Sequence, residues 1–255
     1  MGNIVVLSLL ALQVSPSGAA AFNDTKTVAA VEAQSRPKSE LSSEMRGDIA
    51  MARKDYRQAV ELYKSVQPPT HIIYNKIGIA YHQLTDMDTA LRFYQRAIKA
   101  KPDYPEAINN LGAIHYAQKG YRRAVSLYSR ALKLTPNSAS IHSNLGTAWF
   151  ARKNYQKASA EYQLALDLDP EVFEHRSTNG VLLQERSVVE RAKFHYYLAK
   201  TYAKAGAHER ALQYMRKALE EGFKERKKFV EDPEFAALQQ LPEFQELLAS
   251  NPRVL

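Results

Sequence analysis

Histidine, serine and acidic side chains are the groups with which this chain could do chemistry, but their spacing does not assemble a reaction centre. His115, His142 and His195 fall within helical patterns without a second histidine four residues away, so we expect them to be packed or to line a groove. No phosphate-binding loop, dinucleotide fingerprint, serine elbow, zinc-protease motif or calcium loop occurs in the sequence. The sequence therefore predicts no enzyme activity, no metal site and no cofactor.

Composition narrows the classes of protein further. Cysteine is absent, which excludes structural disulfides, thiolate catalysis and cysteine-ligated zinc. The net charge of +8 fits an acidic protein partner, an acidic envelope surface or nucleic acid, and has no bearing on the fold. Part of this charge lies on Arg122, Arg123, Arg130, Lys133 and the run Lys224–Lys228. These residues fit a solvated surface with interspersed acids, which has no binding function. The functional alternative is a site that binds a polyanion.

The N-terminus has the pattern of an export signal. An apolar run extends from Ile4 to Val14, and it is too short to span a bilayer. Ala19 and Ala21 fit the small-x-small cleavage pattern, which predicts cleavage after Ala21 and export to the periplasm or the medium. A buried N-terminal helix is the alternative interpretation.

The middle of the chain repeats itself every 34 residues. "NLGAIHYAQKGYRRAVSLYSRALKLTP" from Asn110 returns as "NLGTAWFARKNYQKASAEYQLALDLDP" from Asn144. The equivalent positions hold leucine, glycine, tyrosine, alanine and proline: Leu111/Leu145, Gly112/Gly146, Tyr121/Tyr155, Ala124/Ala158, Tyr128/Tyr162, Ala131/Ala165 and Pro136/Pro170. This period and pattern resemble those of the tetratricopeptide repeat family. The resemblance implies an all-α, right-handed superhelical solenoid of antiparallel helix pairs.

Each repeated residue has a physical role in such a pair. Gly112 and Ala124 are small where two helices must approach closely, and Tyr121 and Tyr128 fill the space between helices. Pro136 helps to end one unit before the next begins.

Weaker units flank the regular ones. A first unit begins near Glu40 and ends three residues short, and a last unit resumes at Ala192 with Met215 in place of the usual aromatic residue. Beyond Gly222, Asp232-Pro233 and Pro242-Glu243 predict two helices that cover the end of the array. The predicted organisation is a signal peptide (1–21), a flexible leader (22–39), repeat units one to four (40–172), an insertion (173–191), a fifth unit (192–225) and a C-terminal helical cap (226–255).

The insertion interrupts an otherwise regular array. Asn179-Gly180 is a tight-turn pattern that fits a small hairpin or an irregular loop. Ser187 and Glu190 form a capping box that predicts a helix start at Val188. The stretch is either a spacer that resets the stacking of units or a ledge that presents polar side chains to a partner, namely Arg176, Gln184 and Arg186.

The resemblance also implies where a ligand binds. Members of this family generally bind peptides or protein segments in a concave groove lined by the first helix of each pair. The implied lining combines an amide-rich row with an aromatic row: Asn75, Ile79, His82, Asn109, Asn110, Ala113, Tyr116, Ser143, Asn144, Thr147 and Phe150. Amides can hydrogen-bond an extended backbone while the aromatic rings contact its side chains. Asn110 and Asn144 resemble the asparagine ladder of some relatives, which Lys76 and Tyr197 interrupt here.

These observations favour a non-enzymatic scaffold of the cell envelope that binds a peptide or protein segment in the groove. The main alternative is a protein that binds a polyanion (lipopolysaccharide, acidic glycan or nucleic acid) through its basic face. An accessory subunit of a separate enzyme is the third interpretation. Nucleic acid is not expected as the partner of an exported chain, membrane association is at most peripheral, and the sequence does not give the oligomeric state.

Overall fold

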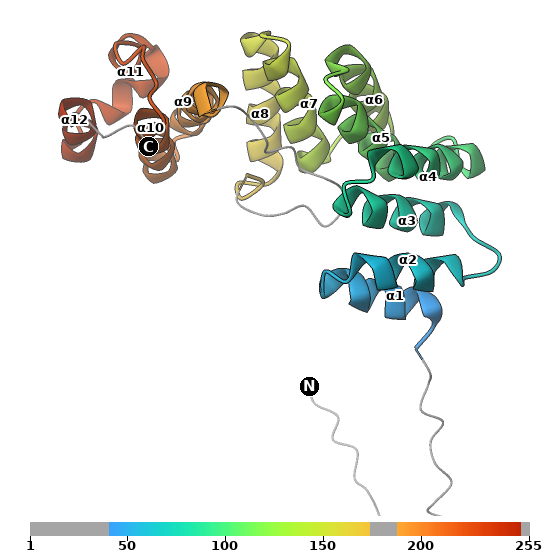
Figure 1. Cartoon of the computed structure of the whole chain (residues 1–255). Helices are drawn as coiled ribbons and strands as arrows, with labels where there is room; N and C mark the ends of the chain where they lie inside the picture. Colours follow the sequence, from blue (N-terminus) through green and yellow to red (C-terminus); the bar gives the residue numbers. More distant parts are fainter. Residues whose placement is uncertain (1–40, 174–187, 251–255) are drawn as a thin grey trace, which may run out of the picture. The chain divides into compact units, whose positions relative to one another are not determined.

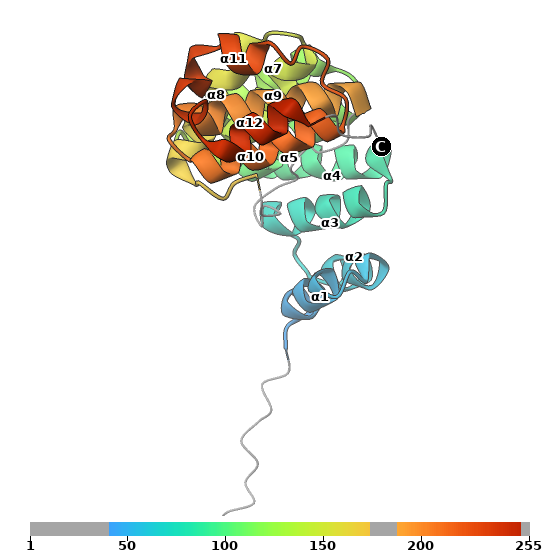
Figure 2. The same cartoon turned by 90° about the vertical axis from the view of Figure 1, so that its left-hand side faces the viewer.

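The computed structural model describes residues 41–173 and 188–250. Within these ranges no strand occurs, and ten helices follow one another in five pairs. The pairs are α1 (Ser43–Ala52) with α2 (Tyr56–Lys64), α3 (His71–Gln83) with α4 (Met87–Ala100), α5 (Pro105–Ala117) with α6 (Tyr121–Leu134), α7 (Ala139–Ala151) with α8 (Tyr155–Leu168), and α9 (Val188–Lys204) with α10 (His208–Glu220). Figures 1 and 2 show the two helices of a pair side by side. The prediction of an all-α array of helix pairs is confirmed.

A glycine on the first helix meets a tyrosine on the second helix in each of the first four pairs. A Cβ added at Gly47, Gly78, Gly112 or Gly146 would lie 2.4–2.7 Å from a ring carbon of the partner tyrosine. These tyrosines, which include Tyr128, are at most 1% exposed. In the fifth pair, Ala199 and Met215 take the equivalent positions and are both fully buried. The close contact of the two helices therefore requires a small residue on one side of it.

The turn inside each pair has a left-handed residue that the sequence analysis did not anticipate. Lys54, Thr85, Lys119 and Lys153 have φ near +60°, and Gly206 has φ of +75°. The interval from Lys54 to Thr85 is 31 residues, whereas the next two intervals are 34 residues each, so the first unit is three residues shorter. The interval from Lys153 to Gly206 is 53 residues and contains the irregular stretch.

Three short helices follow the fifth pair, which is one more than the sequence analysis predicted. The 3-10 helix η1 (Pro233–Leu238) and α12 (Pro242–Ala249) begin at the two predicted prolines. The additional α11 (Lys228–Glu231) precedes them, and its Phe229 is fully buried against Tyr196 and Phe223. Burial of this ring gives the short helix its place in the core, because a four-residue helix has little stability of its own.

Several predicted segments lie outside the described residues. These are the signal peptide, the leader and nearly all of the insertion, including its tight turn; only the start of α9 at Val188 agrees with the expected helix start. None of the described helices is both long enough and apolar enough to cross a bilayer.

Candidate functional site

The eleven residues predicted to line the groove lie on α3, α5 and α7, the first helices of pairs two to four. Ile79 and Tyr116 are partly exposed, so a ligand can reach them. The other nine are at most 9% exposed: Asn75, His82, Asn109, Asn110, Ala113, Ser143, Asn144, Thr147 and Phe150. These nine side chains contact the protein itself, and their contact with a peptide stays a prediction. The possible insertion contacts Arg176, Gln184 and Arg186 lie outside the described residues.

The predicted amide row is a chain of hydrogen bonds between neighbouring first helices. Asn110 Nδ2 donates to Asn75 Oδ1 at 3.1 Å, which joins α5 to α3. Asn144 Nδ2 donates to Asn109 Oδ1 at 3.1 Å, which joins α7 to α5. Asn109 and Asn110 are themselves linked at 3.4 Å. Because these amides are buried, their hydrogen bonds to one another satisfy groups that would otherwise be costly to enclose.

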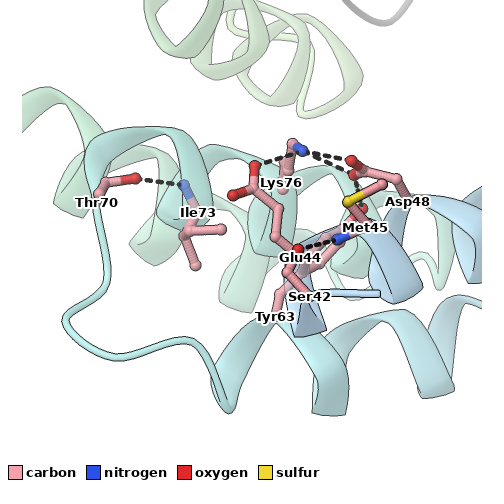
Figure 3. A network of polar contacts seen from close by, with 8 residues as sticks. All are labelled: Ser42, Glu44, Met45, Asp48, Tyr63, Thr70, Ile73 and Lys76. Carbon is pink, nitrogen blue, oxygen red and sulfur yellow. Dashed lines mark hydrogen bonds and ion pairs between the residues drawn. The ribbon is translucent and has the colours of Figure 1, made fainter. Parts of the chain in front are cut away.

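Lys76 continues the contacts from α3 to α1 with charges instead of amides (Figure 3). Its ammonium lies 2.8 Å from Glu44 Oε1 and 2.8 Å from Asp48 Oδ1. The Tyr63 hydroxyl donates to the same Asp48 carboxylate at 2.7 Å. Burial lowers the pKa of Lys76, but hydrogen bonds to Asp48 and Glu44 outweigh burial and leave this pKa above its usual value. Lys76 interrupts the asparagine ladder in the sequence, and in the structure it replaces an amide contact by an ionic one.

The two helices that carry this ionic network begin at side-chain caps. Ser42 Oγ accepts from the backbone amide of Met45 at 3.2 Å, and Thr70 Oγ1 accepts from that of Ile73 at 3.3 Å (Figure 3). Such caps satisfy amides of the first turn that have no partner within the helix. They fix where α1 and α3 start, and the helical spacing then places Glu44 and Lys76 opposite each other.

Aromatic rings make the next contact between first helices, from α7 to α9. The ring of Phe150 lies 5.9 Å from the rings of both Phe194 and Tyr197, edge to face. Tyr155, at the start of α8, stacks on Tyr197 at 5.0 Å. The two aromatic residues of the predicted row therefore have different surroundings. Phe150 is enclosed by α9, whereas Tyr116 contacts Tyr121 and keeps an exposed edge.

Charged and phenolic groups connect α9 to the cap. Lys200 Nζ lies 2.8 Å from Asp232 Oδ2 and 3.2 Å from Glu234 Oε2. The Tyr196 hydroxyl donates to the same Asp232 carboxylate. Burial lowers the pKa of Lys200, but the two carboxylates more than compensate and raise it overall. We name this series of contacts between neighbouring first helices, from the Lys76 ion pairs through the amides and aromatic rings to Lys200, the first-helix seam.

Models of one protein family match most of the residues that form this seam. A tetratricopeptide repeat model matches residues 72–137, and a second model of the same repeat matches residues 109–172 and 182–223. Together they cover more than half of the chain. The chain is a tetratricopeptide repeat protein.

Individual relatives of this tetratricopeptide repeat protein match only parts of it. Photosystem I assembly protein Ycf3 of Rippkaea orientalis is 31% identical over 78 residues, which are 31% of this chain and 44% of Ycf3. The chain thus spans less than half the length of the Ycf3 proteins that it matches. A solved structure of MamA from Desulfovibrio magneticus RS-1 is 20% identical, and the match covers 72% of this chain and 94% of MamA with a TM-score of 0.49. A solved structure of the first tetratricopeptide repeat domain of Spaghetti, bound to an HSP90 peptide, is 25% identical to this chain. The match covers 43% of this chain and 86% of the Spaghetti chain, with a TM-score of 0.40.

His142 lies between two acceptors in the fourth repeat. Its Nδ1 is 2.7 Å from Glu161 Oε2 on α8, and its Nε2 is 2.9 Å from the carbonyl oxygen of Pro136. Only the imidazolium has a hydrogen on both nitrogens, so this geometry favours the charged ring. The hydrogen bond to Glu161 raises the pKa of His142 and burial opposes it, with a net increase.

Within residues 41–173 and 188–250, no three metal-binding side chains come together.

We expect His142 to stabilise this tetratricopeptide repeat protein most at acidic pH. Because its folded-state pKa is raised, its contribution is fully present below the unfolded-state pKa of about 6.5 and is lost as the pH rises through the folded-state value. The variant His142→Gln should therefore lose about 1–2 kcal/mol more unfolding free energy near pH 5.5 than near pH 9. Urea denaturation of both proteins at the two pH values measures this difference.

The pKa of His82 is shifted in the opposite direction from that of His142, so its contribution to stability should depend on pH in the opposite way. Burial lowers its pKa to about 4, so its contribution is present above about pH 6.5 and is lost as the pH falls from there. The variant His82→Gln should therefore be most destabilised, relative to wild type, at the higher pH. If His142→Gln and His82→Gln shift stability in the same direction with pH, the assignment of a charged His142 is wrong.

The sequence analysis missed the carboxylates at both ends of the seam. Glu44 and Asp48 could have been found, since the 31-residue first interval places them in register with Asn75 and Ile79 of the predicted lining. Asp232 lies beyond the last repeat, where no periodicity assigns its position.

Proposed function

We propose that this tetratricopeptide repeat protein is a non-catalytic scaffold that binds a peptide or protein segment along the exposed edge of its first helices. The observation that carries the proposal is the repeat array itself, because members of this family generally bind such ligands through the first helix of each pair. The Ycf3 relatives are named as assembly proteins, which supports a role in holding other proteins together. The cell-envelope location is part of the proposal and rests on the apolar run of residues 4–14 and its cleavage pattern.

The burial of the amide row favours the more exposed side chains as contacts for the ligand. Asn109, Asn110 and Asn144 are at most 1% exposed and bond to one another between first helices, so the proposal does not depend on their contact with a peptide, which stays a prediction. Ile79 and Tyr116 keep partly exposed apolar surface, and a rigid tyrosine is a frequent anchor residue in interfaces. At α1 this edge carries negative charge. Glu44 and Asp48 are 40% and 47% exposed, and their two carboxylates share the single ammonium of Lys76. A ligand with an apolar side chain and a basic residue would fit this edge.

Site-specific photo-cross-linking tests the proposal in the full chain. With a benzophenone amino acid in place of Tyr116, we expect a discrete cross-linked protein after irradiation in the source cells. The matched control replaces Gln213, which is exposed on the second helix α10, and should give no such product. Once the partner is known, Tyr116→Ala should weaken its binding by about tenfold or more, as for a typical aromatic anchor.

Two results would contradict the proposal. The first is the same cross-linked product from both positions, since contact would then be non-specific. The second is a product from position 213 alone, since the partner would then bind the second helices. Circular dichroism of both labelled proteins shows that each retains its helices.

A further inference from the structure

The second helices α4, α6 and α8 carry exposed side chains at equivalent positions of three successive repeats. The 34-residue period relates Arg96 to Arg130 and Leu164, and it relates Lys99 to Lys133. We name this set the outer face, and it consists of Arg92, Arg96, Lys99, Arg130, Lys133, Leu134, Leu164 and Leu168, all exposed. A hydrogen bond of 2.6 Å from Arg130 Nη2 to the carbonyl oxygen of Pro102 connects α6 to the turn that follows α4.

The basic residues that α4 and α6 contribute to the outer face have almost no acidic neighbours on their own helices. The sequence of α6 has no acidic residue, and α4 has one, Asp88, in its first turn. In the described part of the chain, the ion pairs lie on other elements and none involves α4 or α6. The acids interspersed among these cations are thus few, namely Asp88 on α4 and the exposed Asp167 on α8, which takes the position equivalent to Lys99 and Lys133. Unpaired cations at this density attract an anionic surface.

Exposed leucines distinguish among the anionic partners that such a face could bind. Leu134, Leu164 and Leu168 are 41%, 46% and 42% exposed on the same helices. A nucleic acid is bound by cations together with aromatic rings on which bases stack. Phe93, the ring beside Arg96, is only partly exposed and already stacks on Tyr81. Basic residues beside exposed leucines are instead typical of proteins that lie on a membrane surface. We propose that the outer face docks on a bilayer surface that carries anionic phospholipid headgroups.

This docking is peripheral and independent of the peptide site. The headgroups attract Arg92, Arg96, Lys99, Arg130 and Lys133, and the leucines enter the boundary between headgroups and acyl chains. The first-helix edge around Tyr116 belongs to other helices and keeps its own ligand. The scaffold would thus hold its protein partner close to the membrane without crossing it.

Sedimentation with lipid vesicles tests the proposal on the full chain. The protein should sediment with vesicles of phosphatidylcholine mixed with phosphatidylglycerol and stay in solution with phosphatidylcholine alone. Each basic residue near such a surface contributes roughly a fivefold gain in binding, so the variant Arg96→Glu, Lys99→Glu, Lys133→Glu should lose at least about 100-fold. The charge-matched control Lys204→Glu, Lys224→Glu, Lys227→Glu reverses three exposed lysines elsewhere and should bind as wild type.

The apolar part of the face has its own variant. Leu134→Ser with Leu168→Ser should lower vesicle binding about tenfold and make the remainder more sensitive to salt, because only the electrostatic part is left.

Three outcomes would overturn the proposal. Equal losses in the two charge-reversal variants would show that net charge alone attracts the vesicles. Binding to heparin or a single-stranded oligonucleotide, without binding to anionic vesicles, would make the face a site for a soluble polyanion. Failure of the anionic vesicles and of both soluble polyanions to bind would leave the cations solvated. The cross-link from position 116 should persist in the outer-face variant, so the peptide-binding proposal stands or fails separately.

Discussion

The variant Phe235→Ala should lose about 3–5 kcal/mol of unfolding free energy in the C-terminal part of the array. Phe235 is fully buried, and its ring lies 5.2 Å from Phe229 and 6.1 Å from Tyr196. Truncation to alanine would leave a cavity where the cap contacts α9, and a short 3-10 helix cannot collapse far enough to fill it. Hydrogen exchange of α9 to α12 measures the loss, which should be small in α1 to α6 because repeats interact with their neighbours only.

Val230→Ala is the control for this substitution. Val230 is 51% exposed on the adjacent α11, so its truncation should change stability by less than about 0.5 kcal/mol. An equal loss in both variants, or a Phe235→Ala loss spread evenly over all five pairs, would contradict the assignment of Phe235 to the core of the cap.

Gly112→Val should destabilise the third repeat by about 1–3 kcal/mol through overpacking. A Cβ at this position would lie 2.7 Å from Cε1 of Tyr128, which is closer than real Cβ contacts come. Tyr128 is fully buried, so a shift of its ring would displace the atoms that enclose it. The helices α5 and α6 would have to separate, and thermal or urea unfolding of the full chain would record the loss.

A second substitution shows whether this contact is the cause. In Gly112→Val, Tyr128→Leu, the shorter side chain should relieve the clash, so the double variant should lose less than the sum of the two single losses. Strict additivity would place the cost of Gly112→Val elsewhere. An unchanged melting temperature for Gly112→Val would contradict the helix contact itself.

The sequence predicts the helix pairs and their internal contacts well because each repeat carries its own packing rules. Gly112 and Tyr128 recur at fixed spacing, and only a close crossing of two helices explains a small and a large residue at these positions. Pro233 and Pro242 mark helix starts by their fixed backbone angle. These features depend on residues near one another in the chain.

Exposure of the groove residues could not be predicted in the same way. The repeat pattern identifies Asn109 and Asn144 as equivalent, but their burial depends on how closely α5 approaches α7, which is a property of two units together. Lys76 appears in the sequence as a break in the ladder, and its role emerges only with Glu44 and Asp48 from the preceding unit. Contacts between neighbouring units therefore cannot be predicted from the repeat pattern alone and become visible only in the structure.

The first-helix seam also bears on how the array folds. Nearly identical repeats could pair out of order, which is a characteristic failure of repeat proteins during folding. Here the junctions use three kinds of contact, with ion pairs from α1 to α3 and again at the cap, amides from α3 to α5 and from α5 to α7, and aromatic rings from α7 to α9. A mispaired junction would leave a charge or an amide buried without its partner, which costs free energy. The seam therefore disfavours the exchange of units between junctions of different kinds, whereas the two amide junctions share one chemistry.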